Sequence, residues 1–236
     1  AFVDAFIARG RAAGGRDEDL VATAAAFTAA TIADQYTRWL PTPPADGDAH
    51  LTEQRVASSE LLRGHFLHVM RDTVRLPGGQ LTTREYVVHP GAVMVIPLLD
   101  DGRVLLERQY RYPMQRVMIE FPAGKLDSGE TTLECAQREL FEETGYRAGQ
   151  WAKAGVIHPV IAYSTEFIEV WFARDLVPGP SQLDSGEFLE VFDAPAVELI
   201  TACLEGQVTD AKTVAAALWL QHYMAGTWSP AWHSGV

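Results

Sequence analysis

Three glutamates at helical spacing are the chemically most informative feature of this 236-residue sequence. Glu139, Glu142 and Glu143 stand at positions i, i+3 and i+4, so an α-helix would project them from one face. Like charges at this spacing destabilise a helix by about a few tenths of a kcal/mol per pair. A divalent cation relieves that repulsion, because carboxylate oxygens and water suit Mg²⁺ or Mn²⁺. The alternative is a solvated acidic helix face, which is the usual meaning of a bare run of charges.

The neighbouring residues predict a helix with defined ends. Thr131 followed by Glu134 forms a capping box, and Gly145 stands where a left-handed C-terminal cap is expected. The sequence therefore predicts a helix over roughly 132–144. An adjacent face of this helix carries apolar residues that can pack on a sheet, namely Leu133, Ala136 and Leu140.

The glutamates belong to a longer pattern of fixed spacing. Gly124 is followed after five residues by Glu130, and after seven more by Arg138–Leu140, Glu142–Glu143 and Gly145–Tyr146. This pattern resembles the Nudix box, G-x5-E-x7-R-E-U-x-E-E-x-G-U, where U is a bulky aliphatic residue. All seven fixed identities match, and the aromatic residue at the last position is the one departure. That position serves packing, so the departure matters little. Seven identities at fixed spacing make the resemblance to the Nudix family specific.

The resemblance implies a fold and a reaction. It implies an α/β protein with a mixed β-sheet in an α/β/α sandwich. It also implies metal-dependent hydrolysis of a nucleoside diphosphate linked to another moiety, with Mg²⁺ or Mn²⁺ as cofactor. Residues 84–126 and 206–221 further resemble the bacterial ADP-ribose pyrophosphatase branch, which produces AMP and ribose 5-phosphate. One departure concerns the substrate, since Ile161 stands where many of these enzymes have proline before a motif matched by 162–164.

Other functions stay open at this point. A second Nudix activity would act on GDP-mannose, other nucleotide sugars, NADH or dinucleoside polyphosphates. A function of another class would be a non-catalytic, nucleotide-sensing Nudix domain. Such sensors often lose box glutamates and carry a DNA-binding module, whereas here the box is intact and no basic helix-turn-helix pattern occurs.

The resemblance assigns metal-binding roles to single residues. It implies that Glu139, Glu142 and Glu143 bind metal and that the loop before the helix folds back to offer a backbone carbonyl. The carbonyl would come from Ala123 or Gly124. Two further box residues would support the site: Glu130, in the metal network, and Arg138, which would hold a box carboxylate in place.

The catalytic base and the substrate contacts lie outside the box. In the ADP-ribose branch a carboxylate on a later loop is the general base, and within 183–191 Glu187 aligns best with it. Glu190 and Asp184 are the competitors. Arginine suits bidentate contacts to phosphate or ribose. The candidates for substrate contact are Arg84 and Arg111, with Arg108 weaker, and Phe66, which this branch would stack on adenine unless it is a core residue.

Composition narrows the partners. The chain has 19 basic and 31 acidic residues, a net charge of −12, which disfavours binding to nucleic acid. No apolar run reaches the ~18 residues of a membrane span, and the short run 21–33 follows acidic residues, unlike a signal peptide. The two cysteines, Cys135 and Cys203, cannot form a disulfide framework. We therefore expect reduced thiols and a cytoplasmic location, and the family resemblance implies a small nucleotide sugar as ligand.

The chain is expected to have three parts. Residues 1–50 would be a helical extension, over 18–40, and a Pro-rich linker. Antiparallel strands are expected in 51–90, and the family resemblance implies that they exchange with a second subunit in a homodimer, with Phe66 or Arg84 in the partner's site. The Nudix domain would be 91–236. The predicted strands are 62–76, 82–89, 91–99, 103–112, 117–121, 153–161, 166–173 and 188–192, and the later helices are 195–206 and 210–225.

Removal of residues 1–50 should leave both the hydrolytic activity and the association into a dimer unchanged. The reason is that this segment lies outside the family resemblance and carries no recognisable chemistry. Activity assays and sedimentation analysis of the truncated chain test this. A truncated dimer that is folded but inactive would show that the extension contributes to the site.

Overall fold

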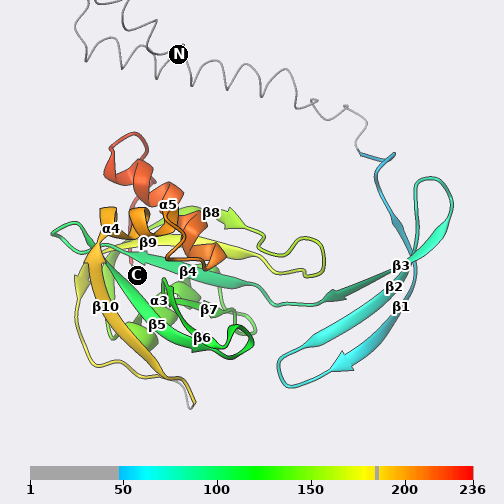
Figure 1. The fold of residues 1–236 in the computed structure, drawn as a ribbon, viewed down its shortest axis with the longest axis horizontal. Coiled ribbons are helices and arrows are strands. Elements are labelled where there is room, and N and C mark those ends of the chain that lie inside the picture. The colour runs from blue at the N-terminus through cyan, green and yellow to red at the C-terminus, as the bar shows by residue number, and fades with distance from the viewer. Residues whose placement is uncertain (1–47, 184–185, 236) are drawn as a thin grey trace, which may run out of the picture. The chain divides into compact units, whose positions relative to one another are not determined.

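The computed structural model of the protein describes residues 48–183 and 186–235 (Figure 1). The predicted helix over 18–40, most of the Pro-rich linker and Asp184 lie outside the described residues. The chain divides into two compact units, whose described parts are 48–54 with 74–82, and 55–73 with 83–183 and 186–235.

The described residues form strands and helices in a mixed order, as the fold class predicts. No helix among them is long and apolar enough to cross a membrane. In chain order the elements are β1 (Gln54–Arg63), β2 (His68–Arg75), β3 (Leu81–Val87), β4 (Ala92–Pro97), β5 (Arg103–Arg111), the short 3-10 helix η1 (Tyr112–Met114), β6 (Arg116–Glu120), β7 (Ala123–Lys125), α3 (Thr132–Thr144), β8 (Arg147–Ile157), β9 (Ile168–Val177), β10 (Leu189–Pro195), α4 (Ala196–Leu204), α5 (Ala211–Met224) and β11 (His233–Ser234).

A five-stranded mixed sheet lies at the centre, with strand order β11-β8-β9-β4-β7. β4 runs parallel to β9, while β7 pairs with β4, and β8 with β9, in antiparallel register. All of β4 is buried, which explains why its sequence is continuously apolar rather than alternating. A second sheet has the order β10-β5-β6, and a third, N-terminal sheet has the order β1-β2-β3.

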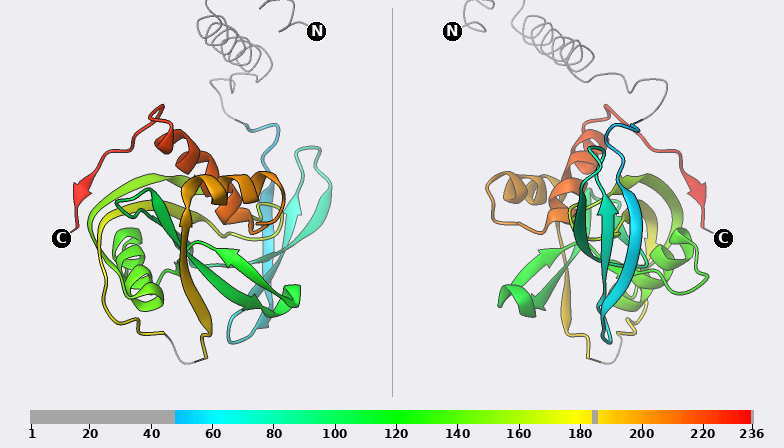
Figure 2. Two further views of the ribbon diagram at one scale, coloured as in Figure 1. Left: turned by 60° about the vertical axis from the view of Figure 1, so that its left-hand side comes forward. Right: turned by 90° about the vertical axis from the view of Figure 1, so that its right-hand side faces the viewer.

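The central sheet separates two hydrophobic cores, so the α/β/α sandwich is confirmed. On one face Val93 and Val95 pack with Ala136 and Leu140 of α3. On the other face Met94 and Ile96 belong to the core that contains residues of α4 and α5. Figure 2 shows α3 on one side of the sheet and the two C-terminal helices on the other. α3 is thereby held against the end of the sheet that carries β7.

The single long strand predicted over 62–76 is wrong. A turn divides it, because the N–H of Gly64 donates to the carbonyl of Leu67 at 2.8 Å, and β1 and β2 lie on either side. Phe66 therefore lies in the turn, with 65% of its surface exposed, instead of on the first strand. The alternation of apolar and polar residues runs through both strands and the turn, so the pattern alone did not mark the break.

Two later strands are displaced from their predicted positions. β8 begins at Arg147 and ends at Ile157, earlier than the predicted 153–161, because the strand follows directly on the helix cap and residues 159–163 form a turn. β9 likewise extends to Val177, beyond the predicted 166–173. Two very short strands, β7 and β11, were not predicted.

Candidate active site

Helix α3 has the ends that the sequence predicts. The Thr131 side chain accepts a hydrogen bond from the N–H of Glu134, and the Glu134 carboxylate accepts one from the N–H of Thr131 at 2.8 Å. At the other end Gly145 has φ 78°, in the left-handed region, and its N–H donates to the carbonyl of Phe141. These caps determine which residues of the helix face the loop that precedes it.

The loop before α3 folds back closely onto the helix. A Cβ atom on Gly124 would lie 1.7 Å from Oε1 of Glu139, so a side chain at this box position would require the Glu139 carboxylate to move. The N–H of the preceding residue, Ala123, donates to Oε2 of Glu143 at 3.0 Å. Loop backbone and helix carboxylates therefore share one small space, as the box resemblance implies.

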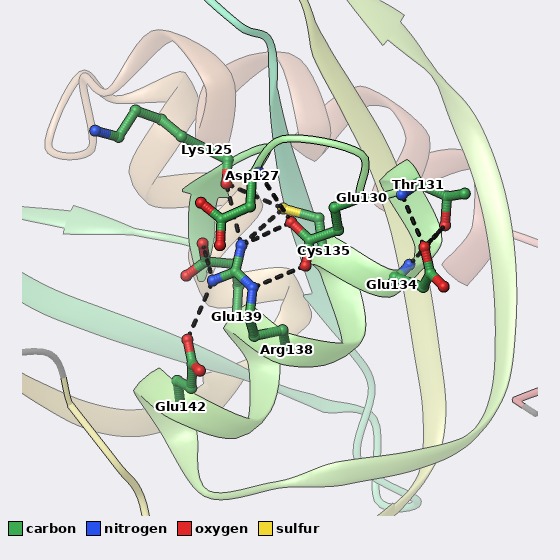
Figure 3. A network of polar contacts seen from close by, with 9 residues as sticks. All are labelled: Lys125, Asp127, Glu130, Thr131, Glu134, Cys135, Arg138, Glu139 and Glu142. Carbon is green, nitrogen blue, oxygen red and sulfur yellow. Dashed lines mark hydrogen bonds and ion pairs between the residues drawn. The ribbon is translucent and has the colours of Figure 1, made fainter.

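Arg138 connects the loop and the helix (Figure 3). Its Nε donates to Oε1 of Glu130 at 2.8 Å, and its Nη1 donates to Glu139 at 2.8 Å and to Glu142 at 3.1 Å. Its Nη2 also reaches the carbonyl of Lys125 at 3.1 Å. These hydrogen bonds from the guanidinium lower the pKa of Glu130 to about 2. Arg138 thus holds several box carboxylates in place, and Glu130 in turn orients the guanidinium group of Arg138.

The ionised forms of Glu139 and Glu143 are electrostatically costly. Burial, with the neighbouring charges of Glu142 and Glu187, raises the pKa of Glu139 to about 7 although Arg138 opposes the shift. Burial also raises the pKa of Glu143 well above its usual range, assisted by the charges of Glu107 and Glu139. The protein therefore places more negative charge here than its own cations offset.

Glu107 is part of this excess, although sequence reasoning missed it. It lies on β5, opposite Glu120 on β6, and is 3% exposed. Its charge helps to raise the pKa of Glu143, and its Oε1 is buried without a hydrogen-bond partner in the described structure. Burial raises the pKa of Glu107 to about 7. A charged residue directly after the apolar run Val104–Leu106 was the available signal.

The donor set fits a divalent cation of the oxygen-binding kind. Glu139 and Glu143 supply carboxylate oxygens beside the loop backbone of Ala123, and their mutual repulsion is relieved by positive charge. In the described part of the chain no three acidic, histidine or cysteine side chains already converge on one point. Arg138 bonds one oxygen each of Glu139 and Glu142 and both oxygens of Glu130, and the N–H of Ala123 bonds one oxygen of Glu143. Glu130 would therefore reach a cation only after exchange of its contacts with Arg138.

A cavity of about 460 Å³ opens on the carboxylate cluster, a size typical of small-ligand sites. It brings together most of the residues singled out in the sequence, but Arg84, Glu130 and Glu142 do not line it. Of the predicted site residues, the lining includes Phe66, Arg111, Ala123, Gly124, Arg138, Glu139, Glu143 and Glu187, and it adds His89, Gln109, Lys125, Asp127, Glu166 and Lys212.

The remaining candidates lie elsewhere. Arg84 on β3 donates to the carbonyl of Thr83 at 3.1 Å. Arg108 forms an ion pair with Glu190 at 3.1 Å, and the Glu190 side chain is 74% exposed. Among the carboxylates of the loop before β10 that the structure describes, Glu187 is thus the one at the cavity.

The lining of the cavity also includes two cations that share one glutamate. Arg111, at the end of β5, forms two hydrogen bonds with the carboxylate of Glu120, each 2.7 Å long. Lys212 of α5 forms an ion pair with the same carboxylate. Burial acts to raise the pKa of Glu120, but the two cations outweigh it and the pKa lies below its usual value. Glu120 and Lys212 were not identified from the sequence, because each is a single charged residue without a repeating pattern.

The raised pKa of Glu139 makes the stability of the metal-free protein depend on pH. A glutamate in the unfolded chain titrates near 4.5 and Glu139 in the folded chain at about 7, so within this window the folded state binds more protons. Its contribution to stability therefore falls as pH rises through the window. In EDTA, the Tm of Glu139→Gln should rise relative to wild type between about pH 5 and pH 8, because glutamine cannot ionise. A Tm difference that is constant over this range, measured by circular dichroism, would contradict the costly ionisation.

Comparison with known proteins agrees with this geometry. The NUDIX domain model matches residues 88–216, and the nucleoside diphosphate sugar hydrolase N-terminal domain model matches residues 53–87. An ADP-ribose pyrophosphatase of Bacillus subtilis (strain 168) is 35% identical over 173 residues, covering 72% of this chain and 94% of that protein. A methanol dehydrogenase activator of Bacillus methanolicus is 34% identical over 173 residues, covering 72% of this chain and 92% of that protein.

A solved structure shows the same fold. It is described as an ADP compounds hydrolase, superposes with a TM-score of 0.67 at 23% identity, and covers 75% of this chain and 96% of that chain. The family model alone matches more than half of the chain and contains the whole segment from Gly124 to Tyr146. The chain with this buried carboxylate cluster therefore belongs to the Nudix hydrolase family.

Proposed function

We propose that this protein hydrolyses the pyrophosphate bond of ADP-ribose, or of a closely related ADP-sugar, to AMP and a sugar phosphate. The observation that carries the proposal is one cavity whose lining includes Glu139 and Glu143 of α3 together with Arg111 of β5. The glutamates offer a cation site, and the arginine suits a phosphate or ribose of the substrate. The Bacillus subtilis relative named ADP-ribose pyrophosphatase supports the choice of substrate.

The cofactor we propose is Mg²⁺ or Mn²⁺, held by Glu139 and Glu143 with the carbonyl of Ala123, and with Glu142 as a further ligand. When bound, a divalent cation supplies charge that offsets the negative charge growing on the phosphates and favours the ionisation of water. Arg138 keeps the carboxylates in place, because it bonds both the loop and the helix. Glu130 in turn orients Arg138.

Glu187 is the general base in this proposal. It lines the same cavity as the metal-binding carboxylates, and its charge acts on Glu139. During hydrolysis a water oxygen attacks one phosphorus atom, the bond from that phosphorus to the bridging oxygen breaks, and the carboxylate of Glu187 takes the proton of the water.

The substrate contacts we propose are Phe66 and Arg111. Phe66 lies at the cavity with the ammonium group of Lys125 4.5 Å from its ring centre, so one ring face is covered and the other can stack on adenine. Arg111 would contact phosphate or ribose. Arg84, which lies off this cavity, would contribute only from a second subunit.

A homodimer fits this arrangement, with residues 51–90 as the exchanging strands and 91–236 as the Nudix domain. Every residue of β1 is exposed, including Val56, Leu61 and Leu62, whose burial against a second copy would be favourable. We further propose a cytoplasmic location, supported by Cys135 and Cys203, which are both free thiols.

The experiment that tests the function is a substrate panel with Mg²⁺ and with Mn²⁺, read by release of AMP. ADP-ribose should be hydrolysed best, and GDP-mannose, NADH and dinucleoside polyphosphates more slowly. As a control, Glu143→Gln should lose more than about 10²-fold in turnover, since loss of even an outer partner of a metal ligand costs about 10- to 100-fold. Preferred release of GMP, or equal turnover by the control variant, would overturn the proposal.

Glu187→Gln should lower kcat on ADP-ribose by about 10²-fold, the usual scale for loss of a general base. Its affinity for Mn²⁺, followed by electron paramagnetic resonance, should change little. Glu190→Gln is the matched control, because this neighbouring glutamate is exposed and paired with Arg108, and its kcat should stay near wild type. If the control variant is the impaired one, the base has been assigned to the wrong residue.

A further inference from the structure

The first turn of α5 brings Lys212 to the cavity. Asp210 caps this helix, and its carboxylate accepts hydrogen bonds from the N–H of Thr213 and from Nζ of Lys212, each at 3.0 Å. The ammonium group also forms an ion pair with Glu120. The Lys212 side chain is only 12% exposed, so the helix cap and β6 hold the ammonium group in one place.

Glu120 is the link between this lysine and the arginine at the cavity. Its side chain is 4% exposed, and the Lys212 and Arg111 pairs together keep its pKa low, so it stays ionised. Two parallel hydrogen bonds of 2.7 Å join it to Nε and Nη2 of Arg111. Such a fork fixes both the position and the plane of a guanidinium group.

Arg111 needs this support because of its place in the fold. It is the last residue of β5, its side chain is 44% exposed, and a short 3-10 helix follows at once. A long arginine side chain at a strand end has considerable rotamer freedom, which binding would have to remove. The Glu120 carboxylate removes much of that freedom before substrate arrives. The orientation of the carboxylate in turn depends on its other partner, Lys212.

We infer that Lys212 is a positioning residue for substrate binding, which holds Glu120 and, through it, the guanidinium group of Arg111 at the cavity. The inference rests on the proposed function, in which Arg111 contacts the substrate. It makes helix α5 part of the binding machinery, although this helix lies almost a hundred residues after β6 in the sequence.

Lys212→Met tests the inference, because methionine preserves length and removes the charge. KM for ADP-ribose should rise by about tenfold with kcat within about twofold, the scale of one hydrogen bond to a charged group. Lys212→Arg should recover most of the affinity, since it restores a cation for Glu120. An unchanged KM in Lys212→Met would overturn the inference.

The matched control is Lys153→Met. Lys153 on β8 also forms an ion pair with a buried glutamate, Glu169, but neither residue lines the cavity. Its loss should lower Tm without any change in KM. A rise in KM as large as that of Lys212→Met would show a general effect of destabilisation and would overturn the inference.

A double-mutant cycle separates positioning from direct contact. In an Arg111→Ala background, Lys212→Met should add almost nothing to the loss of affinity, because both changes break one chain of contacts. Two losses that multiply would mean that Lys212 acts without Arg111, and would overturn the inference. Inactivity of the wild-type chain on ADP-ribose would instead refute the proposed function. In that case calorimetric titration with ADP would decide the inference by the same comparison of variants.

Discussion

The guanidinium group of Arg138 is the contact on which the arrangement of the box depends. Helix α3 and the loop before it both carry glutamates, and these carboxylates repel one another. Arg138 donates to Glu139 and Glu142 on the helix and to Glu130 and the carbonyl of Lys125 on the loop. One positive charge thus offsets several negative ones while it fixes the distance between loop and helix. The glycine of the box allows this approach, since a side chain at position 124 would require the Glu139 carboxylate to move.

Part of the repulsion among the buried carboxylates is not offset by cations of the protein. Glu107, Glu139 and Glu143 are buried and have raised pKa values, so each ionised form is costly without an added cation. A domain selected only for stability would replace such residues or pair them with lysine. Here Lys212 and Arg111, which line the same cavity, pair with Glu120 instead. One cavity therefore holds both buried carboxylates and cations, which suits a ligand that brings both a divalent cation and a diphosphate.

The parts of the molecule that could be predicted from sequence are those with a repeating or strictly spaced signal. The capping box at Thr131, the cap at Gly145 and the apolar run over 91–99 each identified an element, because local physics alone determines them. The hairpin turn at Gly64 was not predicted, since the alternation continued across it. The starting point of β8 was also wrong, because the strand follows directly on the cap of α3 and pairs from Arg147 with the end of β9 at Val177.

Residues that are brought together only by tertiary contacts could not be predicted from the sequence. Glu107 and Glu120 are opposite each other only because β5 and β6 pair in a particular register, and Lys212 reaches Glu120 only because α5 packs on β4 and β8 of the central sheet. A shift of β6 by a single residue would move Glu120 to the other face of the sheet, away from Arg111. The box motif therefore identifies where a cation can bind, while the register of two strands and the position of one helix bring Arg111, Glu120 and Lys212 together. Substrate selection in such a protein depends on tertiary packing that no local motif records.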